Sequence, residues 1–513
     1  MPGGWRWNGR KATRVNQGDL PAGQEGCSCL HIKEPKSPSG EAGVRAPIVA
    51  KKLRNGSGAK GAQEGGDVPD RATEDKPAAV PAMATQVGEV RARWAWTEPA
   101  VWTERMLTAL EQGVKGGKWF SLIDKVYRRA NLQSAFARVK ANQGAAGVDH
   151  QTIEMFEQHL EANLEQLAKA LADGSYRPQA LRRKWLPKPG SSEKRPLGIP
   201  TVRDRVVQTA LRAVLEPIFE RIFAAHSYGF RPGRGCKDAL RRVNYLLKQG
   251  YHWVVDADLK SYFDTILFGP LLARVKEQVA DGAVLALIEA YLHQGVLEAM
   301  NWWQPEAGTP QGAVISPLLS NIYLNPLDHL LAQQGIEMVR YADDFVIMCR
   351  SEAEAQRALA LVQQWTAEAG LTLHPAKTRI VDATKHGGFD FLGYHFERGY
   401  RWPRRKSLKK LKDKIRVLTK RHHGQSLPVI ISRVNRVTKG WFGYFKHSHY
   451  TTFKPLDQWV RMRLRSLLKK RRKRRGWATS RRDHQRWPNA FFAAQGLFSL
   501  AQAHAPLRQS SRR

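Results

Sequence analysis

The sequence predicts an α+β fold that ends in a basic helical domain. Three stretches have the length and apolar content of strands: YHWVVDADLKSYFDTI (251–266), MVRYADDFVIMCRS (338–351) and GGFDFLGYHF (387–396). Helical stretches separate them, and tight turns are expected to join strands into hairpins. This mixture favours α+β over a doubly wound parallel sheet. After the last strand, basic and apolar residues alternate with the spacing of an amphipathic helix.

The N-terminal part of the chain differs in composition from the rest. Residues 1–95 are rich in Gly, Pro, Ala, Ser and Lys and have no apolar periodicity, so we expect them to be disordered. Alternatively they are an extension upstream of the true start, since Met83 could serve as initiator. Order is expected from about Trp102, where WTERMLTALEQG predicts a helix with Thr103 or Trp102 near its N-cap.

The following elements alternate between helix, turn and strand. SLIDKVYRRANLQSAFARVKAN predicts two helical segments, and GAAGVD predicts a turn before a helix over 152–174 that ends at Gly174. ALRRKWLPKPG (180–190) alternates like a strand. SSEKRPLGIPTVRDR (191–205), punctuated by Pro and Gly, predicts a loop, and 206–227 predicts a helix.

The charge of the chain points to a polyanionic partner. The 513 residues include 83 Lys and Arg against 46 Asp and Glu, a net charge of +37 with an isoelectric point near 10.3. Such a surplus favours binding to nucleic acid over an anionic membrane, because no apolar run of membrane-spanning length and no signal peptide is evident. The four cysteines show no disulfide framework or zinc-site spacing, which indicates a reducing compartment.

Most of this charge lies in one segment. Residues 401–482 hold 28 Lys and Arg against two acids, a net charge of +26, and Lys469 to Arg475 are seven consecutive cations. The segment could be a solvated tail or a localisation signal. Aromatic and aliphatic residues interrupt it, however, and its apolar stripe favours a folded basic helical module: Val460, Leu464, Leu467 and Leu468.

Acidic residues follow two of the predicted strands. Asp258 ends the apolar run VVDAD, with Asp256 and Asp264 on either side, and Asp343 and Asp344 lie at the tip of a predicted hairpin. Burial of adjacent carboxylates is costly unless cations neutralise them, and Mg²⁺ with its hard oxygen ligands is the usual solution. The alternatives are a helix cap at Asp258 and a solvated Asp-Asp turn.

A glycine-containing loop lies between these acids in the chain. In GTPQGAVISPLLSN, Gly308 and Gly312 would let the backbone approach a ligand closely. Ser316 as N-cap and Pro317 at the first helical position predict a helix start. Its buried stripe would then comprise Leu319, Ile322, Tyr323 and Leu327. An ordinary turn into a core helix is the alternative.

Together these motifs resemble a known family. DLKSYFD, GTPQGAVISPLLSN, YADDFV, GLTLHPAKT (370–378) and FLGY (391–394) are similar to successive motifs of reverse transcriptases. KRPLGIPTVRDRVVQ and HSYGFRPGRGCKDAL narrow the resemblance to proteins encoded by bacterial group II introns, and residues 441–477 resemble their maturase, or thumb, domain. The resemblance covers about residues 100–505 and implies an RNA-directed DNA polymerase of the right-hand fold.

The resemblance implies a role for each matched residue. Asp258, Asp343 and Asp344 would hold two Mg²⁺ ions with the Leu259 carbonyl, and Lys377 would protonate the leaving pyrophosphate or merely face a phosphate. For the dNTP substrate, the nucleotide-binding residues would be a triphosphate-gripping arginine, a steric gate against ribose and a backbone-contacting glutamine: Arg195, Phe263 and Gln311. A core phenylalanine is the alternative at Phe263, and FLGY resembles a primer grip.

The resemblance also implies partners and domain bounds. Intron RNA would bind the cationic block Arg471, Arg472, Lys473, Arg474 and Arg475, target DNA would be a second partner, and no membrane is involved. The oligomeric state is open, with a homodimer as one option, and a bacterial cytoplasmic, nucleoid-associated location is expected. The expected divisions are a disordered extension, fingers and palm, a thumb/maturase domain and a tail: 1–95, 100–395, 400–490 and 491–513.

One departure from the family bears on mobility. Many members end in an HNH endonuclease with paired Cys and His ligands, but no cysteine follows Cys349. We therefore expect a short form that does not itself cleave the bottom DNA strand. Its DNA synthesis would be primed from nascent strands at a replication fork or from another nick. Two alternatives remain: a non-catalytic RNA-binding splicing factor, and a reverse transcriptase domesticated for phage defence or spacer acquisition.

Overall fold

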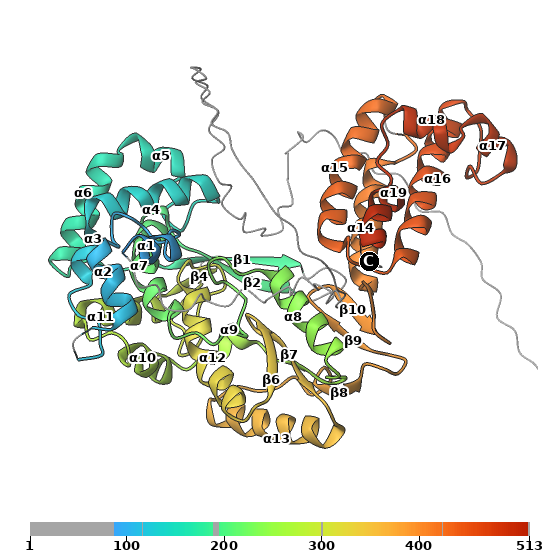
Figure 1. Ribbon diagram of the computed structural model, residues 1–513. Coiled ribbons are helices and arrows are strands. Elements are labelled where there is room, and N and C mark those ends of the chain that lie inside the picture. Colours follow the sequence, from blue (N-terminus) through green and yellow to red (C-terminus); the bar gives the residue numbers. More distant parts are fainter. Residues whose placement is uncertain (1–86, 115, 188–193, 299–300, 423, 511–513) are drawn as a thin grey trace, which may run out of the picture. The chain divides into compact units, whose positions relative to one another are not determined.

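The computed structural model describes residues 87–114, 116–187, 194–298, 301–422 and 424–510 (Figure 1). The disorder expected for residues 1–95 is wrong for its last part, since Val87–Arg93 form a helix; residues 1–86, with the start at Met83, lie outside the described residues. Order begins before Trp102, because α1 (Val87–Arg93) packs on α2 (Glu104–Gln112). Trp94 is buried there, and Arg93 forms an ion pair with Glu111 at 2.9 Å.

A helical layer follows, comprising α3 (Ile123–Tyr127), α4 (Arg129–Asn142), α5 (Ile153–Gln158), α6 (Leu160–Ala172) and α7 (Val202–Glu220). Thr103 caps α2 as predicted, since its hydroxyl accepts from the Met106 amide. The single helix predicted over 152–174 is wrong: it breaks at His159, whose backbone is not helical. The α7 helix is buried almost all round, as expected of a helix at the centre of a core.

The hairpin sheet has the strand order β2-β1-β4-β5. Its strands are β1 (Leu181–Pro187), β2 (Lys194–Ile199), β4 (Val296–Glu298) and β5 (Asn301–Trp303). The prediction of a loop over 191–205 is wrong for its second part, because β2 pairs antiparallel with β1 from Pro187–Lys194 to Arg182–Ile199. Pro196 is compatible with this pairing because β2 is the edge strand of the sheet.

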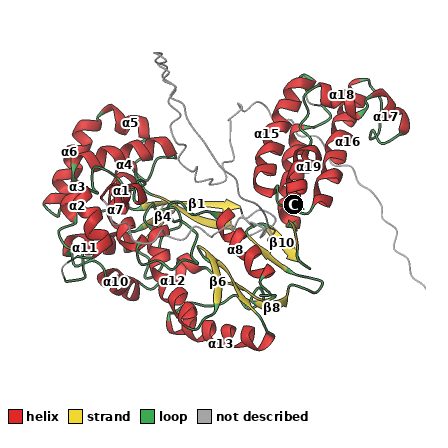
Figure 2. Ribbon diagram, viewed as in Figure 1, coloured by secondary structure: helices red, strands yellow, loops and turns green. Residues whose placement is uncertain are grey.

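The central sheet has the order β6-β7-β3-β8 and carries helices on its faces (Figure 2). Alternate residues of its strands enter two different apolar clusters, Val255 and Ile347 on one side and Val254 and Val346 on the other, as the period of a strand requires. The strands are β3 (Trp253–Asp258), β6 (Glu337–Tyr341), β7 (Asp344–Cys349) and β8 (Arg379–Asp382). The helices of this region are α8 (Cys236–Lys248), α9 (Tyr262–Thr265), α10 (Phe268–Lys276), α11 (Gly282–Leu292), α12 (Ser316–Gln333) and α13 (Glu352–Glu368).

Two details of α12 bear on the predictions. The helix begins at Ser316 with Ile315 at the N-cap, one residue earlier than expected, so Ser316 is helical and is not the cap. The predicted stripe is buried throughout: Leu319, Ile322, Tyr323 and Leu327.

A small sheet, ordered β11-β10-β9, precedes the helical domain. It comprises β9 (Phe389–Phe391), β10 (Tyr394–Glu397) and β11 (Tyr400–Pro403), so the sheet structure extends past residue 395. The helical domain comprises α14 (Arg405–Leu418), α15 (Leu427–Phe445), a 3-10 turn η1 (Tyr450–Thr452), α16 (Phe453–Arg471), α17 (Arg481–Arg486), α18 (Asn489–Ala494) and α19 (Leu500–Ser510).

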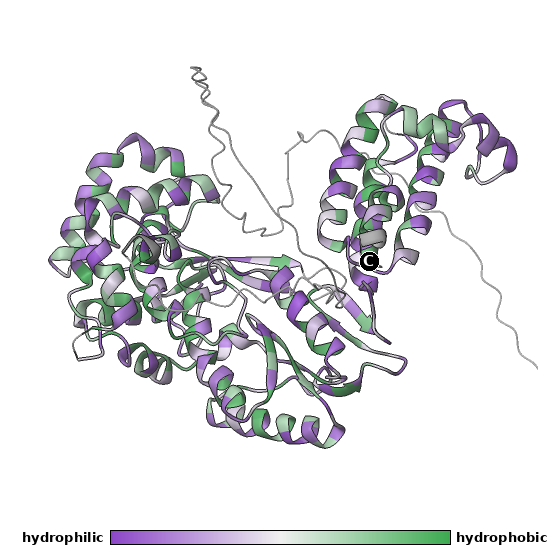
Figure 3. Ribbon diagram, viewed as in Figure 1, coloured by the Kyte–Doolittle hydropathy of each residue, from purple (hydrophilic) through white to green (hydrophobic). Residues whose placement is uncertain are grey.

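The helical domain has its own apolar core, to which the predicted stripe of α16 contributes. The end of the chain differs from the expected tail over 491–513, because α18 and α19 belong to this domain. Asp457 of α16 accepts hydrogen bonds from the Leu500 and Ala501 amides, both at 3.0 Å, and so caps α19. Figure 3 shows α17, by contrast, as mostly hydrophilic. No helix among the described residues is long and apolar enough to cross a membrane.

Candidate active site

Strand register brings the three predicted carboxylates together. Asp258, the last residue of β3, lies directly opposite Asp344, the first residue of β7. Asp343 occupies the turn between β6 and β7 with Ala342, whose positive φ of 60° makes the reversal tight. The hairpin predicted at this position is confirmed, and the β3–β7 pairing places its carboxylates beside the end of β3.

Burial and mutual repulsion disfavour the charged forms of these acids. Burial, followed by the charges of Asp343, Asp256 and Asp258, raises the pKa of Asp344 to about 7. Burial also raises the pKa of Asp343, against the opposing effect of Arg195 and Arg340. The site therefore holds carboxylates that lack full compensation by protein cations, a state that a bound divalent cation relieves.

The fit to Mg²⁺ rests on donor chemistry. Within the residues the structure describes, no three His, Cys, Asp or Glu side chains converge closely enough to hold an ion. What the fold supplies is three carboxylates at neighbouring backbone positions, and these hard oxygen ligands suit Mg²⁺. Leu259 is buried immediately after Asp258, where its backbone pairs with Leu373 in an isolated bridge.

Lys377 lies at this site, as the resemblance implies. Its ammonium group forms an ion pair with Asp258 Oδ2. The GLTLHPAKT segment is tied to the end of β3 by its backbone, since the His374 amide donates to the Asp258 carbonyl at 2.7 Å and the Lys377 amide donates to the His374 carbonyl at 3.1 Å. Both side chains of the ion pair remain partly exposed to solvent.

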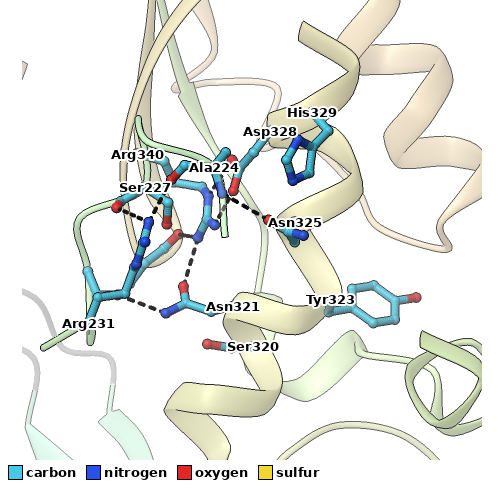
Figure 4. Close-up of polar contacts among 12 residues, drawn as sticks. Ala224, Ser227, Arg231, Ser320, Asn321, Tyr323, Asn325, Asp328, His329 and Arg340 are labelled. Carbon is cyan, nitrogen blue, oxygen red and sulfur yellow. Dashed lines mark hydrogen bonds and ion pairs between the residues drawn. The ribbon is translucent and has the colours of Figure 1, made fainter. Parts of the chain in front are cut away.

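A buried arginine, Arg340, lies beside Asp328 and Asn321 (Figure 4) and donates to the carboxylate turn. Arg340 of β6 is fully buried and pairs with Asp328 of α12, which is also fully buried. The same guanidinium donates to Asn321 Oδ1 and to the Ala342 carbonyl, both at 3.0 Å, and so holds the turn that carries Asp343. Burial by itself lowers the pKa of Arg340, but Asp328 raises it above its ordinary value, so the arginine stays charged.

A glycine lets a second loop pack against this turn. A Cβ on Gly229 would lie 2.2 Å from the Ala342 nitrogen, and Asn321 Nδ2 donates to the Gly229 carbonyl at 2.8 Å. Arg231, which donates to the Ala224 and Ser227 carbonyls, keeps this loop in place (Figure 4). Arg340 and Gly229 are not among the site residues predicted from the sequence. The available signal was a lone arginine inside the apolar strand MVRY, because a buried charge requires a partner.

The glycine loop before α12 connects the central sheet to the hairpin sheet. A Cβ on Gly308 would lie 2.9 Å from the Phe263 carbonyl, and a Cβ on Gly312 would lie 2.4 Å from the Gly198 carbonyl. The Gly198 amide donates to the Gln311 carbonyl at 2.8 Å, so Gln311 lies against β2. The glycine loop therefore packs against two segments that carry predicted nucleotide-binding residues. One holds Phe263 and the other, β2, holds Arg195, while the loop itself holds Gln311.

Phe263 borders the main core. Its ring is half-buried, packs against the main core and meets Tyr262 edge-on at 5.4 Å. Arg195 is exposed on β2, near enough for its charge to lower the pKa of Asp343. Gln311 is half-buried.

Two tyrosines connect the small sheet to the helical domain. The Tyr394 hydroxyl of the FLGY motif donates to the Tyr444 carbonyl at 2.6 Å, and the Tyr444 hydroxyl donates to the Leu392 carbonyl at 2.7 Å. Phe445 packs in the same apolar cluster as Tyr394. These two bonds fix the C-terminal end of α15, in the helical domain, to the predicted primer grip.

The predicted RNA-binding cations lie at and just beyond the end of α16. Arg471 through Arg475 are exposed, and Lys469 pairs with Asp483 at 3.0 Å. The Arg472 guanidinium lies 5.8 Å from the Trp487 ring centroid. The block is therefore attached to a folded helix, and the prediction of a folded basic module in place of a solvated tail agrees with the core beneath it.

Comparison with known protein families identifies the class of this protein. A family model described as reverse transcriptase (RNA-dependent DNA polymerase) matches residues 186–396, which include the carboxylate hairpin, and a model described as group II intron, maturase-specific domain matches residues 408–487. The fold and the site thus define a reverse transcriptase with a maturase-specific domain. Protein YkfC of Escherichia coli is 31% identical over 346 residues, which cover 60% of this chain and 86% of YkfC.

The chain belongs to the family of group II intron-encoded reverse transcriptases with a maturase domain. Group II intron-encoded protein LtrA of Lactococcus lactis subsp. cremoris is 37% identical over 208 residues, 40% of this chain and 34% of LtrA. The chain thus matches about a third of the length of that relative. Among solved structures, a chain of the partial Cas6-RT-Cas1–Cas2 complex is 28% identical with a TM-score of 0.32, covering 48% of this chain and 41% of that chain.

Proposed function

We propose that the protein is an RNA-directed DNA polymerase that binds a group II intron RNA, assists its splicing and copies it into cDNA. The observation that carries this proposal is the register of Asp258 with Asp344, beside Asp343 in the turn, within a chain that also contains a maturase-specific domain. A non-catalytic RNA-binding factor would have no use for repelling carboxylates beside an RNA-binding surface.

In this proposal, Asp258, Asp343 and Asp344 hold two Mg²⁺ ions, with the Leu259 carbonyl as a further ligand. Bound Mg²⁺ supplies activation of the primer 3′-hydroxyl and charge stabilisation of the leaving pyrophosphate. Arg195 grips the triphosphate from β2 with a bidentate guanidinium. Gln311 contacts the nucleotide or template backbone, and Phe263 excludes the ribose 2′-hydroxyl.

Lys377 can deliver a proton to the pyrophosphate. Its ion pair with Asp258 supports this role, because it keeps the ammonium group beside a carboxylate proposed to hold the metal ions, and the pair is partly exposed. The target DNA, a homodimer and the nucleoid location belong to the same proposal. The basic charge of residues 401–482 supports nucleic-acid binding, and the maturase match supports intron RNA as the partner.

The test is primer extension on an RNA template with dNTPs and Mg²⁺. Asp343→Ala should reduce incorporation by at least a thousandfold, because it removes a ligand that the metal ions share with the incoming phosphates. RNA affinity should stay within about twofold, since it rests on distant cations. Near wild-type extension by Asp343→Ala would overturn the metal assignment.

The matched control is Asp382→Asn. Asp382 lies on β8 of the same sheet, opposite Trp253 at the other end of β3 from Asp258, and its carboxylate caps Thr384. This variant should retain full activity. A comparable loss at Asp382 would indicate that removal of any acid from the central sheet disrupts the protein.

The second candidate is a domesticated reverse transcriptase. It would have the same polymerase site and would differ only in its biological role. Splicing assistance discriminates between the two: an intron-encoded maturase accelerates splicing of its own intron RNA, whereas a domesticated enzyme does not.

A further inference from the structure

An exposed tryptophan follows the cationic block of the helical domain. After α16 ends, the chain reverses through Lys473 and Gly476, whose φ angles are 58° and 80°. Trp477 consequently lies against residues from two other places: its ring centroid is 5.6 Å from the Arg421 guanidinium carbon and 5.2 Å from that of Arg463.

Hydrogen bonds hold this arrangement. Arg421 Nη2 donates to the Gly476 carbonyl at 2.9 Å, and Lys469 Nζ donates to the Trp477 carbonyl at 3.2 Å. Arg463 donates to the Thr419 carbonyl at 3.0 Å and to its hydroxyl at 3.1 Å. The backbone of Trp477 and the guanidinium groups beside its ring are therefore fixed before any ligand binds.

The ring itself remains accessible. Trp477 is 50% exposed, whereas Trp459 and Trp487, which also lie beside two cations each, are half-buried and 8% exposed. Those two rings contribute to the core of the helical domain. Trp477 instead keeps half of its surface accessible to a ligand.

The surroundings of the ring favour one kind of ligand. Burial, together with Arg416 and Arg421, lowers the pKa of Arg463, so cations crowd this place without enough counter-charge. The exposed residues Arg471 to Arg475 immediately precede Gly476 and Trp477. A ligand with negative charges next to a flat π-face satisfies both features, and a nucleic acid has phosphates next to bases. Bases in a duplex are stacked on each other, so the ring can accept only an unpaired one.

We propose that Trp477 is a stacking site for an unpaired nucleobase of bound RNA, with the flanking arginines on the adjacent phosphates. This rests on the proposed function of the helical domain in binding intron RNA. It adds a preference for single-stranded positions, such as a bulge or a loop, to the electrostatic attraction that the cationic block exerts on any RNA.

The experiment compares two RNA hairpins of equal nucleotide number, each closed by a non-nucleotide linker, one with a four-nucleotide bulge and one fully paired, for binding to the full chain over a salt series. Wild type should prefer the bulged hairpin. Trp477→Leu should lose about tenfold in affinity for the bulged hairpin, an amount in the range of one base stack, and little for the paired one. Because stacking releases no counterions, the slope of log K against log salt should not change.

Two control variants sharpen the comparison. Trp477→Phe keeps an aromatic face and should retain most of the preference. Trp302→Leu removes an indole that is 61% exposed on β5 of the hairpin sheet, and it should leave the preference intact.

Each outcome decides between the interpretations. If Trp477 only anchors the turn, Trp477→Leu should lower the affinity for both hairpins equally and keep the ratio of the two affinities. That result, or no loss of affinity at all, overturns the proposal. Failure of the RNA-binding function would show differently, as wild-type protein that binds neither hairpin. Because the ratio is taken within each protein sample, partial unfolding of a variant cancels from it.

Discussion

At the scale of single residues, two buried carboxylates are held by different kinds of partner. Asp328 is paired with the equally buried Arg340. Asp204, fully buried near the start of α7, is instead held by neutral donors: the Tyr176 hydroxyl at 2.6 Å and the Gln179 amide at 3.2 Å. Burial therefore raises the pKa of Asp204 to about 6 despite these bonds.

This shift has a defined sign in the stability of the protein. The unfolded state releases the Asp204 proton near the usual pKa of ~3.9, while the folded state keeps it until about pH 6. Unfolding therefore releases this proton between those values, and the stability that protonated Asp204 contributes is lost as the pH rises through about 6. The loss should amount to up to about 3 kcal/mol.

Asp204→Asn should remove that part of the pH dependence. Urea unfolding of wild type and variant at pH values from 4 to 7.5 gives the difference in unfolding free energy, which should change with pH in favour of the variant. Two parallel pH curves would show that Asp204 does not titrate in this range.

The sugar selectivity also depends on one residue. If Phe263 lies under the nucleotide C2′, Phe263→Val should raise incorporation of ribonucleotides at least tenfold relative to deoxyribonucleotides, because the smaller side chain leaves room for the 2′-hydroxyl. Selectivity is measured as the ratio of kcat/KM for dNTP over rNTP. An unchanged ratio, accompanied by a lower Tm, would instead assign Phe263 to the core that it partly contacts.

At the scale of elements, the glycine loop depends on close backbone approach to β2. Gly312→Ala places a Cβ 2.4 Å from the Gly198 carbonyl and at a φ of 115°, which should destabilise the protein by about 1–3 kcal/mol. The displaced Gln311 should also raise the KM for dNTP. Thermal unfolding and steady-state extension measure the two effects.

The control for this substitution is Gly269→Ala. Gly269 lies in α10 with no heavy atom within 4 Å of an added Cβ, so alanine there should be neutral or stabilising. If Gly312→Ala behaves like Gly269→Ala, the loop is free to move away from β2 and its docking does not matter.

Elements with a strong local pattern could be predicted from the sequence. The α16 stripe, the Thr103 cap and the hairpin at 342–343 follow from periodicity and turn chemistry. The strand β2 could not, because Pro and Gly indicate a loop and only pairing with β1 makes the segment extended. Likewise, α19 at the end of the chain depends on Asp457, a residue more than forty positions earlier.

The candidate site shows the same limit. Its carboxylates were evident from their motifs, since their spacing along the chain resembles a family pattern. Their support was not evident: Arg340 reaches Asp328 and Asn321 through tertiary packing, and nothing in the local sequence indicates that pairing.

At the scale of the whole molecule, the charge of residues 401–482 makes RNA affinity sensitive to salt. Replacing Arg471, Arg472, Arg474 and Arg475 by Gln should reduce the magnitude of the log K against log salt slope by roughly three to four, at about 0.7–0.9 for each phosphate contact. Splicing assistance should be lost with it. Extension of a short primed template should persist, because those contacts lie at the central sheet.

A charge-matched variant controls for the change in net charge. It replaces four exposed cations away from the helical domain by Gln: Arg105, Lys118, Lys169 and Lys276. If both quadruple variants lower the slope equally, RNA responds to total charge and the block at the end of α16 has no particular role.

The reciprocal bonds between Tyr394 and Tyr444 bear on how such proteins can recombine. Each tyrosine donates to the backbone of the other's segment, and Phe445 packs in the same cluster as Tyr394, so the small sheet and the end of α15 form one structural unit. A chimera that takes its helical domain from a relative should keep residues 389–445 from a single parent. A crossover placed between the two tyrosines would separate these bonded partners, whereas one placed after the 3-10 turn η1 would leave both bonds within one parent.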